Sequence, residues 1–362
     1  MTEKCQIVIL VKYWVGRMQR KWSQQCYPVV MRYSHTGYCC IDLFTNNLCP
    51  LSVNIMKKAL LPFAIAAIAS PFAAADGPTL YGKANASFQL VDEAGKPDTD
   101  TELRSNASRL GVKGSETLTD NGLKAIYKFE WETFIDDGDK DGAAFTQRNI
   151  YVGVQGGFGS VIGGKYDTPF KVSQNKVDLF NDMEGDIKEV ITSNDNRESN
   201  QVQYSTNSDW SPVRASVSYI ASEGADNDGV SSLIAYDTKA VYVAAAYETD
   251  VDADDLEAIR LVGQFNLGDF QLGALFETQD DAEGESTDGW LASVKWKFAD
   301  KWALKGQYGE SDIIEEGGET YSLGLDRKLT KNTKVYAYYS HNEFADASRD
   351  DDYLGLGMEV KF

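Results

Sequence analysis

Leu123-Lys-Ala-Ile-Tyr-Lys-Phe-Glu-Trp-Glu132 is the stretch that decides the fold, because its side chains change character at every second residue. The apolar face carries Leu123, Ala125, Tyr127, Phe129 and Trp131. The other face is charged except at Ile126. A period of two indicates a β-strand whose two faces meet different surroundings. The same alternation recurs over residues 269–277 and 288–298.

Sixteen such segments follow one another from residue 79 to residue 362. They are expected at 79–91, 106–116, 122–132, 146–155, 159–166, 200–206, 213–221, 230–237, 239–248, 256–267, 269–277, 288–298, 301–309, 319–329, 332–342 and 353–362. Tight turns alternate with longer, mostly acidic loops, as in transmembrane barrels. The sequence therefore predicts an all-β fold, a 16-stranded antiparallel transmembrane β-barrel. A soluble β-sandwich or propeller, which also alternates, is the alternative.

Two further features of the chain favour the barrel over a soluble β-protein. The longest apolar run after residue 75 is Ala240–Tyr247, far shorter than the roughly 20 residues of a spanning helix. A membrane protein without such helices must close its sheet, so that every backbone group is paired. The final segment, Tyr353–Phe362, places Leu354, Leu356, Met358, Val360 and Phe362 on one face. We expect this strand to close onto the first.

An export signal lies inside the chain rather than at its start. Residues 56–75 read MKKALLPFAIAAIASPFAAA, with a basic start at Lys57 and Lys58, an apolar core and small residues before Asp76. This order defines a signal peptide. Because a signal peptide works at a chain start, we expect Met56 to be the initiator and residues 1–55 to be a non-native extension from an early start. A genuine long extension is the alternative. Residues 76–362 are then the barrel.

Cysteine and charge are both unevenly distributed. All five cysteines precede residue 56, at Cys5, Cys26, Cys39, Cys40 and Cys49. A cysteine-free body suits an exported protein, which must not form stray disulfides. Residues 76–362 carry 27 Lys/Arg against 53 Asp/Glu, a net charge of −26. Nucleic acid is therefore excluded as a partner, because phosphate binding needs clustered cations.

Several segments resemble the general diffusion porins of Gram-negative bacteria. They are Leu80–Lys83, Ser108–Glu116, Arg148–Val154, Phe158–Tyr166, Asn200–Tyr204 and Leu329–Tyr336. The terminal Phe362 resembles the signature that the barrel assembly machinery reads in outer-membrane proteins. The resemblance implies a homotrimer in the Gram-negative outer membrane. It also implies a water-filled channel for passive diffusion of small hydrophilic solutes and ions.

The family folds its third loop into the barrel, and residues 167–199 occupy that place here. Within them Asp178, Asp182 and Asp186 resemble the family's acidic loop pattern. The sequence departs from the family at Asn181–Gly185, where Pro-Glu-Phe-Gly-Gly is usual. The resemblance thus implies an inward-folded third loop that carries the acidic side of a pore constriction.

Basic residues are implied on the wall opposite this loop, at Lys83, Arg109 and Arg148. Alternation independently places Lys83 and Arg109 on the lumen face. For Arg148 alternation gives no support, because this residue shares a face with Ile150 and Val152. An inward loop packed on that wall would explain apolar residues on both faces.

Acids facing bases across a constriction create a transverse field that aligns water and dipolar solutes. Such a site makes and breaks no bond, so we expect no enzyme. The alternative for each of these charges is an ordinary solvated lumen residue.

Other motifs do not amount to a catalytic, cofactor or metal site. Asp137–Gly142 resembles the opening of a calcium loop, but Arg148 stands where its bidentate Glu belongs. His341 is the only histidine after residue 75, and Ser340 beside it points to the opposite face of a strand. Acidic loops can gather divalent cations that bridge lipopolysaccharide phosphates, so outer-membrane lipid and lipopolysaccharide are expected partners.

Two other functions remain open for a barrel of this kind. It could serve mainly as an adhesin or receptor, with the long loops as binding surface, or as a pore specific for one solute. A plugged receptor would give no conductance in planar bilayers, whereas a specific pore would show saturable current block by its solute.

We predict that the mature protein begins at Asp76, because Ala73–Ala75 is the well-placed cleavage site. N-terminal sequencing or intact mass of the outer-membrane protein should find that terminus. A mature chain that retains residues 1–55 would contradict both the export signal and the early start.

Overall fold

The computed structural model describes residues 77–362 apart from residues 141, 208, 210, 225–226 and 346–348. It also describes β1 (Arg32–Tyr33) and β2 (Cys39–Cys40), which pair antiparallel. The chain divides into two compact units, residues 1–71 and 72–362. Apart from β1 and β2, the expected extension over residues 1–55 lies outside the described residues. The same holds for the signal peptide over residues 56–75 and the start at Asp76.

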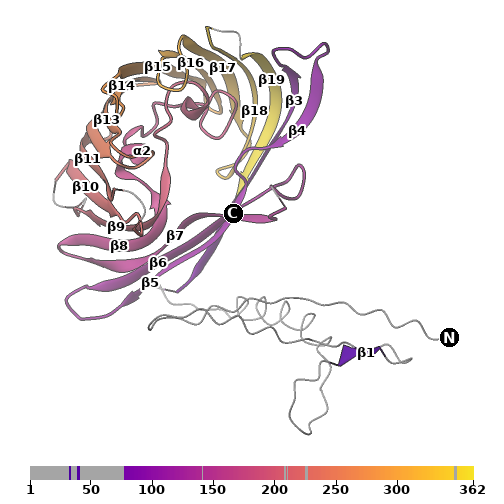
Figure 1. The fold of residues 1–362 in the computed structure, drawn as a ribbon. Helices are drawn as coiled ribbons and strands as arrows, with labels where there is room; N and C mark the ends of the chain where they lie inside the picture. Colours follow the sequence, from indigo (N-terminus) through magenta and orange to yellow (C-terminus); the bar gives the residue numbers. More distant parts are fainter. Residues whose placement is uncertain are drawn as a thin grey trace. The chain divides into compact units, whose positions relative to one another are not determined.

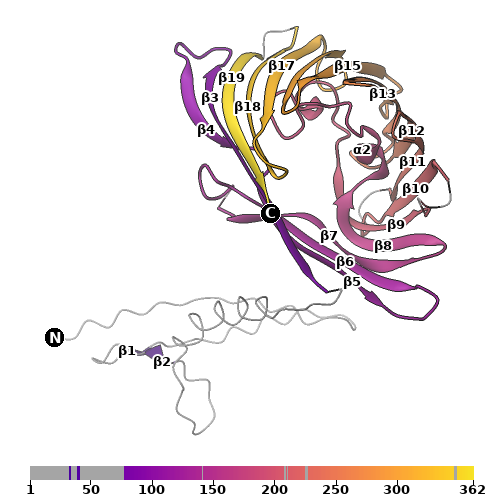
Figure 2. The same cartoon turned by 180° about the vertical axis from the view of Figure 1, so that it is seen from behind.

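The larger unit is a closed barrel of antiparallel strands, seen from opposite sides in Figures 1 and 2. The order of strands around the barrel follows the sequence, and the last strand pairs with the first. The strands are β3 (Thr79–Asp92), β4 (Asp100–Ser105), β5 (Arg109–Thr117), β6 (Lys124–Thr133), β7 (Phe145–Gly156), β8 (Gly159–Asp167), β9 (Arg197–Ser205), β10 (Val213–Ile220), β11 (Gly229–Asp237), β12 (Val241–Thr249), β13 (Glu257–Leu267), β14 (Phe270–Asp280), β15 (Ser286–Ala299), β16 (Trp302–Ser311), β17 (Gly318–Lys328), β18 (Thr333–Glu343) and β19 (Asp350–Lys361).

Strands β4 and β5 are two parts of one position in the wall. Both pair with β3, β4 along Ala86–Val91 and β5 along Thr79–Lys83. Between them Ala107 adopts a φ of +47°, which interrupts the strand. Counted as one position, they complete the sixteen strands that the alternation predicts. The sequence predicts a loop at residues 100–105, whereas the structure has a strand there. The prediction is wrong because the side chains of residues 100–103 are all exposed and show no alternation.

The two faces of the wall differ as a membrane barrel requires. On β13, Ile259 and Leu261 are exposed on the outer face, whereas Ala258, Arg260 and Val262 are buried on the inner face. An apolar exterior around a polar interior suits lipid outside and water inside. Among the described residues, none of the helices has the length and apolar character that crossing a bilayer requires. The predicted transmembrane barrel is confirmed.

The barrel closes at the C-terminus, where β19 pairs with β3 along its length. The Phe362 backbone extends this pairing: its N–H donates to the Gly82 carbonyl at 3.1 Å and its carbonyl accepts from the Gly82 N–H at 3.0 Å. A Cβ atom added at Gly82 would overlap the Phe362 ring, so the close approach requires glycine.

Residues 168–196 connect β8 to β9 and run along the lumen-facing side chains of the wall, inside the ring of strands in Figure 1. They contain a short helix α2 (Pro169–Ser173) and a 3₁₀ turn η1 (Ile187–Glu189). Wall side chains satisfy carbonyls of this irregular backbone. Tyr242 donates to Ser173 at 2.9 Å, Lys305 to Leu179 at 2.7 Å and Asn342 to Glu184 at 2.8 Å. Buried apolar side chains, among them Phe180 and Ile191, pack the loop against the wall.

We predict that deleting Phe362 lowers the yield of folded, heat-modifiable barrel, because the deletion removes two backbone hydrogen bonds and the ring over Gly82. The conductance of the surviving channels should not change. Electrophoresis of unheated samples measures the folded fraction. Phe362→Tyr keeps the ring and should fold like the parent. Normal folding of the deletion variant would contradict the prediction.

Candidate functional site

Three basic residues from neighbouring strands converge on one loop carboxylate. Lys83 of β3 places Nζ 2.7 Å from an Asp182 oxygen, and Arg109 of β5 places Nη2 3.5 Å from the same atom. Arg148 of β7 lies 4.0 Å from the other Asp182 oxygen. The barrel's register sets the first two side by side, because Lys83 and Arg109 are directly opposed residues of β3 and β5. Asp182 is the point where the loop meets this basic wall.

Arg148 reaches the lumen through a β-bulge. Phe129 pairs with Ile150 and Trp131 with Gln147, so Arg148 and the residue after it both face Glu130. A bulge of this kind re-aims a side chain without disturbing the strand beyond it. Val152 accordingly still points outward and is 64% exposed, whereas Arg148 is buried. The bulge, rather than a loop packed on this wall, explains why alternation fails at Arg148.

The three loop acids do not occupy equivalent positions. Of the three, Asp182 is the one whose carboxylate contacts Lys83 and Arg109 and lies near Arg148. Its burial works to raise its pKa, but the positive charges of Lys83, Arg109 and Arg148 outweigh burial and lower the pKa. Asp182 also has a φ of +68°, a strained conformation of the kind found at functional sites.

Asp178 and Asp186 are buried and hold the loop's own backbone. Asp178 accepts from the N–H of Phe180 at 2.9 Å, and Asp186 accepts from the N–H of Asp182 at 2.7 Å. Burial raises the pKa of Asp178 to about 6, and burial together with nearby Asp178 raises that of Asp186. Their carboxylates thus shape the loop that presents Asp182.

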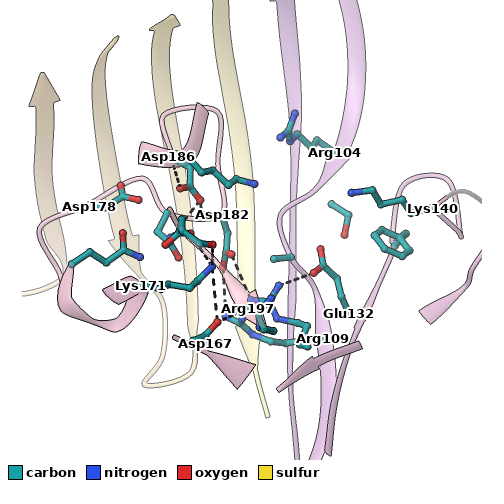
Figure 3. Close-up of a pocket in the computed structure, with 18 of the residues that line it drawn as sticks. Arg104, Arg109, Glu132, Lys140, Asp167, Lys171, Asp178, Asp182, Asp186 and Arg197 are labelled. Atoms are coloured by element: carbon teal, nitrogen blue, oxygen red, sulfur yellow. Dashed lines mark hydrogen bonds and ion pairs between the residues drawn. The ribbon is translucent and has the colours of Figure 1, made fainter. Parts of the chain in front are cut away.

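A charged cavity of about 950 Å³ lies beside this cluster and is drawn in Figure 3. Seventeen of its 25 lining residues are charged, eight basic and nine acidic. Figure 3 shows Asp182 on the loop, with Arg109 and Glu132 on the wall and Lys171, Asp167 and Arg197 at the base of the loop. A lining of this composition is filled by water and ions rather than by apolar ligands.

Several site residues escape prediction from the sequence. Arg104 pairs with buried Glu184, and Glu184 also accepts from Gln89 at 2.8 Å. At the base of the loop, Arg197 contacts Asp167 at 2.6 Å and Lys171 contacts Asp195 at 2.8 Å. Arg104 lies in the strand that the alternation does not reveal. The loop residues follow no period, so only the density of charge near both loop ends could have indicated them.

A fully buried arginine ties both ends of the loop to the wall. Arg260 of β13 donates to Glu277 from Nε at 2.7 Å and approaches it with Nη2 at 2.6 Å. Its guanidinium also donates to Thr192 at 3.0 Å and to the Phe170 carbonyl at 3.2 Å. Thr192 and Phe170 stand near opposite ends of residues 168–196. A guanidinium has enough donors in a fixed plane to hold all of these groups at once.

The motifs that the sequence discounts are placed as follows. Ser340 faces the lumen, where its hydroxyl is 2.8 Å from that of Ser322, while His341 lies 3.0 Å from Asp352. Potential ligand atoms of His341, Glu343 and Asp350 lie within 4.8 Å of one another. Exposed acidic groups are common without a metal. Asp141 of the calcium-like stretch lies outside the described residues.

We predict that Arg260→Met destabilises the barrel by about 3–5 kcal/mol, because Glu277 would remain buried without its counter-ion. Arg214→Met is the matched control: Arg214 also pairs with a carboxylate, Asp237, but is 43% exposed, so about 1 kcal/mol or less should be lost. Denaturant unfolding in detergent measures both. Equal losses in the two variants would contradict the anchoring role.

Comparison with known proteins agrees with this geometry. The family model for Gram-negative porins matches residues 61–347. Outer membrane porin protein 32 of Delftia acidovorans is 26% identical over 336 residues, which cover 84% of this chain and 93% of that protein. Major outer membrane protein P.IB of Neisseria sicca is 36% identical over 130 residues, 34% of this chain, and the match spans 35% of that protein.

Among solved structures, the anion-selective porin from Comamonas acidovorans superposes with a TM-score of 0.66 at 22% identity, over 79% of this chain and 100% of that one. At this identity the likeness concerns the fold. The family match covers most of the chain, and the described residues form a closed barrel with an apolar exterior. The chain therefore belongs to the Gram-negative porin family and is a β-barrel protein of the outer membrane.

Proposed function

We propose that the barrel is a passive, water-filled pore for small hydrophilic solutes and ions, working as a homotrimer. The carrying observation is the cavity beside residues 168–196, whose lining is mostly charged and balanced between acids and bases. Such a lining offers solutes a hydrated path but no apolar pocket to hold them. Diffusion through it requires no bond to be made or broken.

We further propose that residues 168–196 form the constriction and that Asp182 governs its charge. Lys83, Arg109 and Arg148 surround this one loop carboxylate. On the wall, Arg148 also pairs with Glu132 at 2.6 Å and lies 3.5 Å from Glu130. Asp178 and Asp186 contribute through the loop's shape, since their carboxylates accept hydrogen bonds from loop N–H groups. Charges at a narrow, partly desolvated point act on a passing ion at short range and in a low effective dielectric.

The remaining proposals concern the rest of the chain. Residues 1–55 are a non-native extension, residues 56–75 are the signal peptide, and residues 76–362 are the mature porin. Phe362 serves barrel assembly, through the assembly machinery of the outer membrane. The long acidic loops contact lipopolysaccharide, with divalent cations between the two sets of negative charges.

We predict that Asp182→Asn shifts the reversal potential in a salt gradient toward anions, because it removes the loop carboxylate that all three bases face and leaves only the Glu130 and Glu132 pairs of Arg148. The triple variant of Asp178, Asp182 and Asp186 to Asn should shift it in the same direction. Single-channel recording in planar bilayers measures the shift. A complete lack of conductance in the parent protein would contradict the pore itself.

The matched control neutralises acids far from the constriction, at Asp280, Asp281 and Glu283. At about 0.15 M salt the Debye length is about 8 Å, so these loop charges are largely screened. Their removal should shift the potential little at that salt and more at low salt. If Asp182→Asn and the control moved the potential equally at the higher salt, the constriction assignment would be wrong.

A further inference from the structure

A second cavity, of about 580 Å³, opens at the short-turn end of the barrel and shares no lining residue with the cavity at the constriction. It is lined by residues of β15 to β19 and of the short turns that follow β13, β15 and β17. Seven lysines and four carboxylates surround it. We call this group the lysine vestibule, after Lys295, Lys297, Lys301, Lys328, Lys331, Lys334 and Lys361. In barrels of this class the short turns lie on the periplasmic side.

Strand register places lysines of the vestibule directly opposite other lysines. Lys328 is paired with Lys334 across β17 and β18, and Lys361 with Lys83 across β19 and β3. Lys295 is likewise paired with Lys305. Like charges directly opposite each other on two strands are destabilising. Such lysine pairs occur in three pairs of strands, β15–β16, β17–β18 and β19–β3. Because these pairs lower the stability of the barrel, we infer that the lysines serve a function in the lumen.

The carboxylates of the vestibule do not neutralise these lysines. Asp326 lies 3.9 Å from both Lys305 and Lys334, so it is shared between two cations at the limit of an ion pair. Glu359 contacts Lys361 at 3.1 Å. Seven lysines against four carboxylates leave an excess of three positive charges, in a region of the chain whose net charge is −26.

The positive charge continues from the vestibule toward the constriction. Lys305 extends inward from it and donates to the Leu179 carbonyl of the loop at 2.7 Å. Lys83 is paired on one side with Lys361 of the vestibule and on the other with Arg109 of the basic wall. Lys361, Lys83 and Arg109 therefore stand side by side on neighbouring strands, which joins the vestibule to the basic wall of the constriction.

We propose that the lysine vestibule is a binding site for small multivalent oxyanions, such as phosphates and polycarboxylates, at the periplasmic mouth of the pore. Lysines bind such groups as point charges with rotatable donors. A concave wall with an excess of one sign raises the local concentration of counter-ions. This inference rests on the proposed pore, because anions reach the site from water and leave through the lumen.

The test is block of the chloride current by pyrophosphate added to one side of a single channel and then to the other. The parent protein should be blocked at about tenfold lower concentration from one side, because the vestibule and its excess positive charge lie at the short-turn end of the barrel. Lys328→Gln with Lys334→Gln should raise that lower blocking concentration by about tenfold and remove most of the difference between the sides. Lys328→Arg with Lys334→Arg keeps the charge and should retain the block.

Lys96→Gln with Lys239→Gln is the matched control, since it removes the same charge from exposed residues outside the vestibule. It should leave the block unchanged. A conducting parent channel that pyrophosphate blocks equally from both sides would overturn the vestibule while leaving the pore intact. Block by acetate at the same concentration as pyrophosphate would overturn the preference for multivalent anions. A parent protein without any conductance would instead overturn the proposed pore.

Discussion

Pairing of every backbone N–H and C=O within the sheet is the constraint on which the rest of this structure depends. Lipid offers no hydrogen bonds, so the sheet must close, and here β19 closes onto β3 with Phe362 extending the seam. A closed sheet has two faces in different media, and side chains alternate between them. The lipid face must be apolar, so the residues that meet solutes are confined to alternate positions, except where a bulge such as that at Arg148 breaks the order.

The same constraint governs residues 168–196, which have no strand neighbours to pair with. Their carbonyls are satisfied by lumen side chains such as Lys305, Asn342 and Tyr242, and Arg260 holds both ends. Polar residues of the lumen thus have two tasks, since some hydrate the path and others hold the loop. A buried polar side chain in this barrel cannot be assigned to conduction by its position alone.

Sequence reasoning succeeds here wherever one strand's alternation contains the information. It predicts the sixteen-strand barrel and places Lys83 and Arg109 on the inner face. It fails at residues 100–105, because the side chains of residues 100–103 are exposed without alternation. It also does not predict that Arg148 faces the lumen, because a bulge depends on how two strands pair. Sequence reasoning also does not predict that Asp178, Asp182 and Asp186 occupy different positions. Their regular spacing makes them look alike, but which carboxylate bonds to backbone N–H groups depends on the folded loop.

Net charge is the property of this chain that is least informative about its lumen. An excess of 26 acidic charges over residues 76–362 suggests a pore for cations. Three bases nevertheless converge on Asp182, and lysines outnumber acids in the vestibule. Screening over about 8 Å separates these local fields from the acids of the long loops. An ion in the lumen therefore responds to the charges within its own Debye length, which have a positive excess in the vestibule and are nearly balanced in the cavity at the constriction.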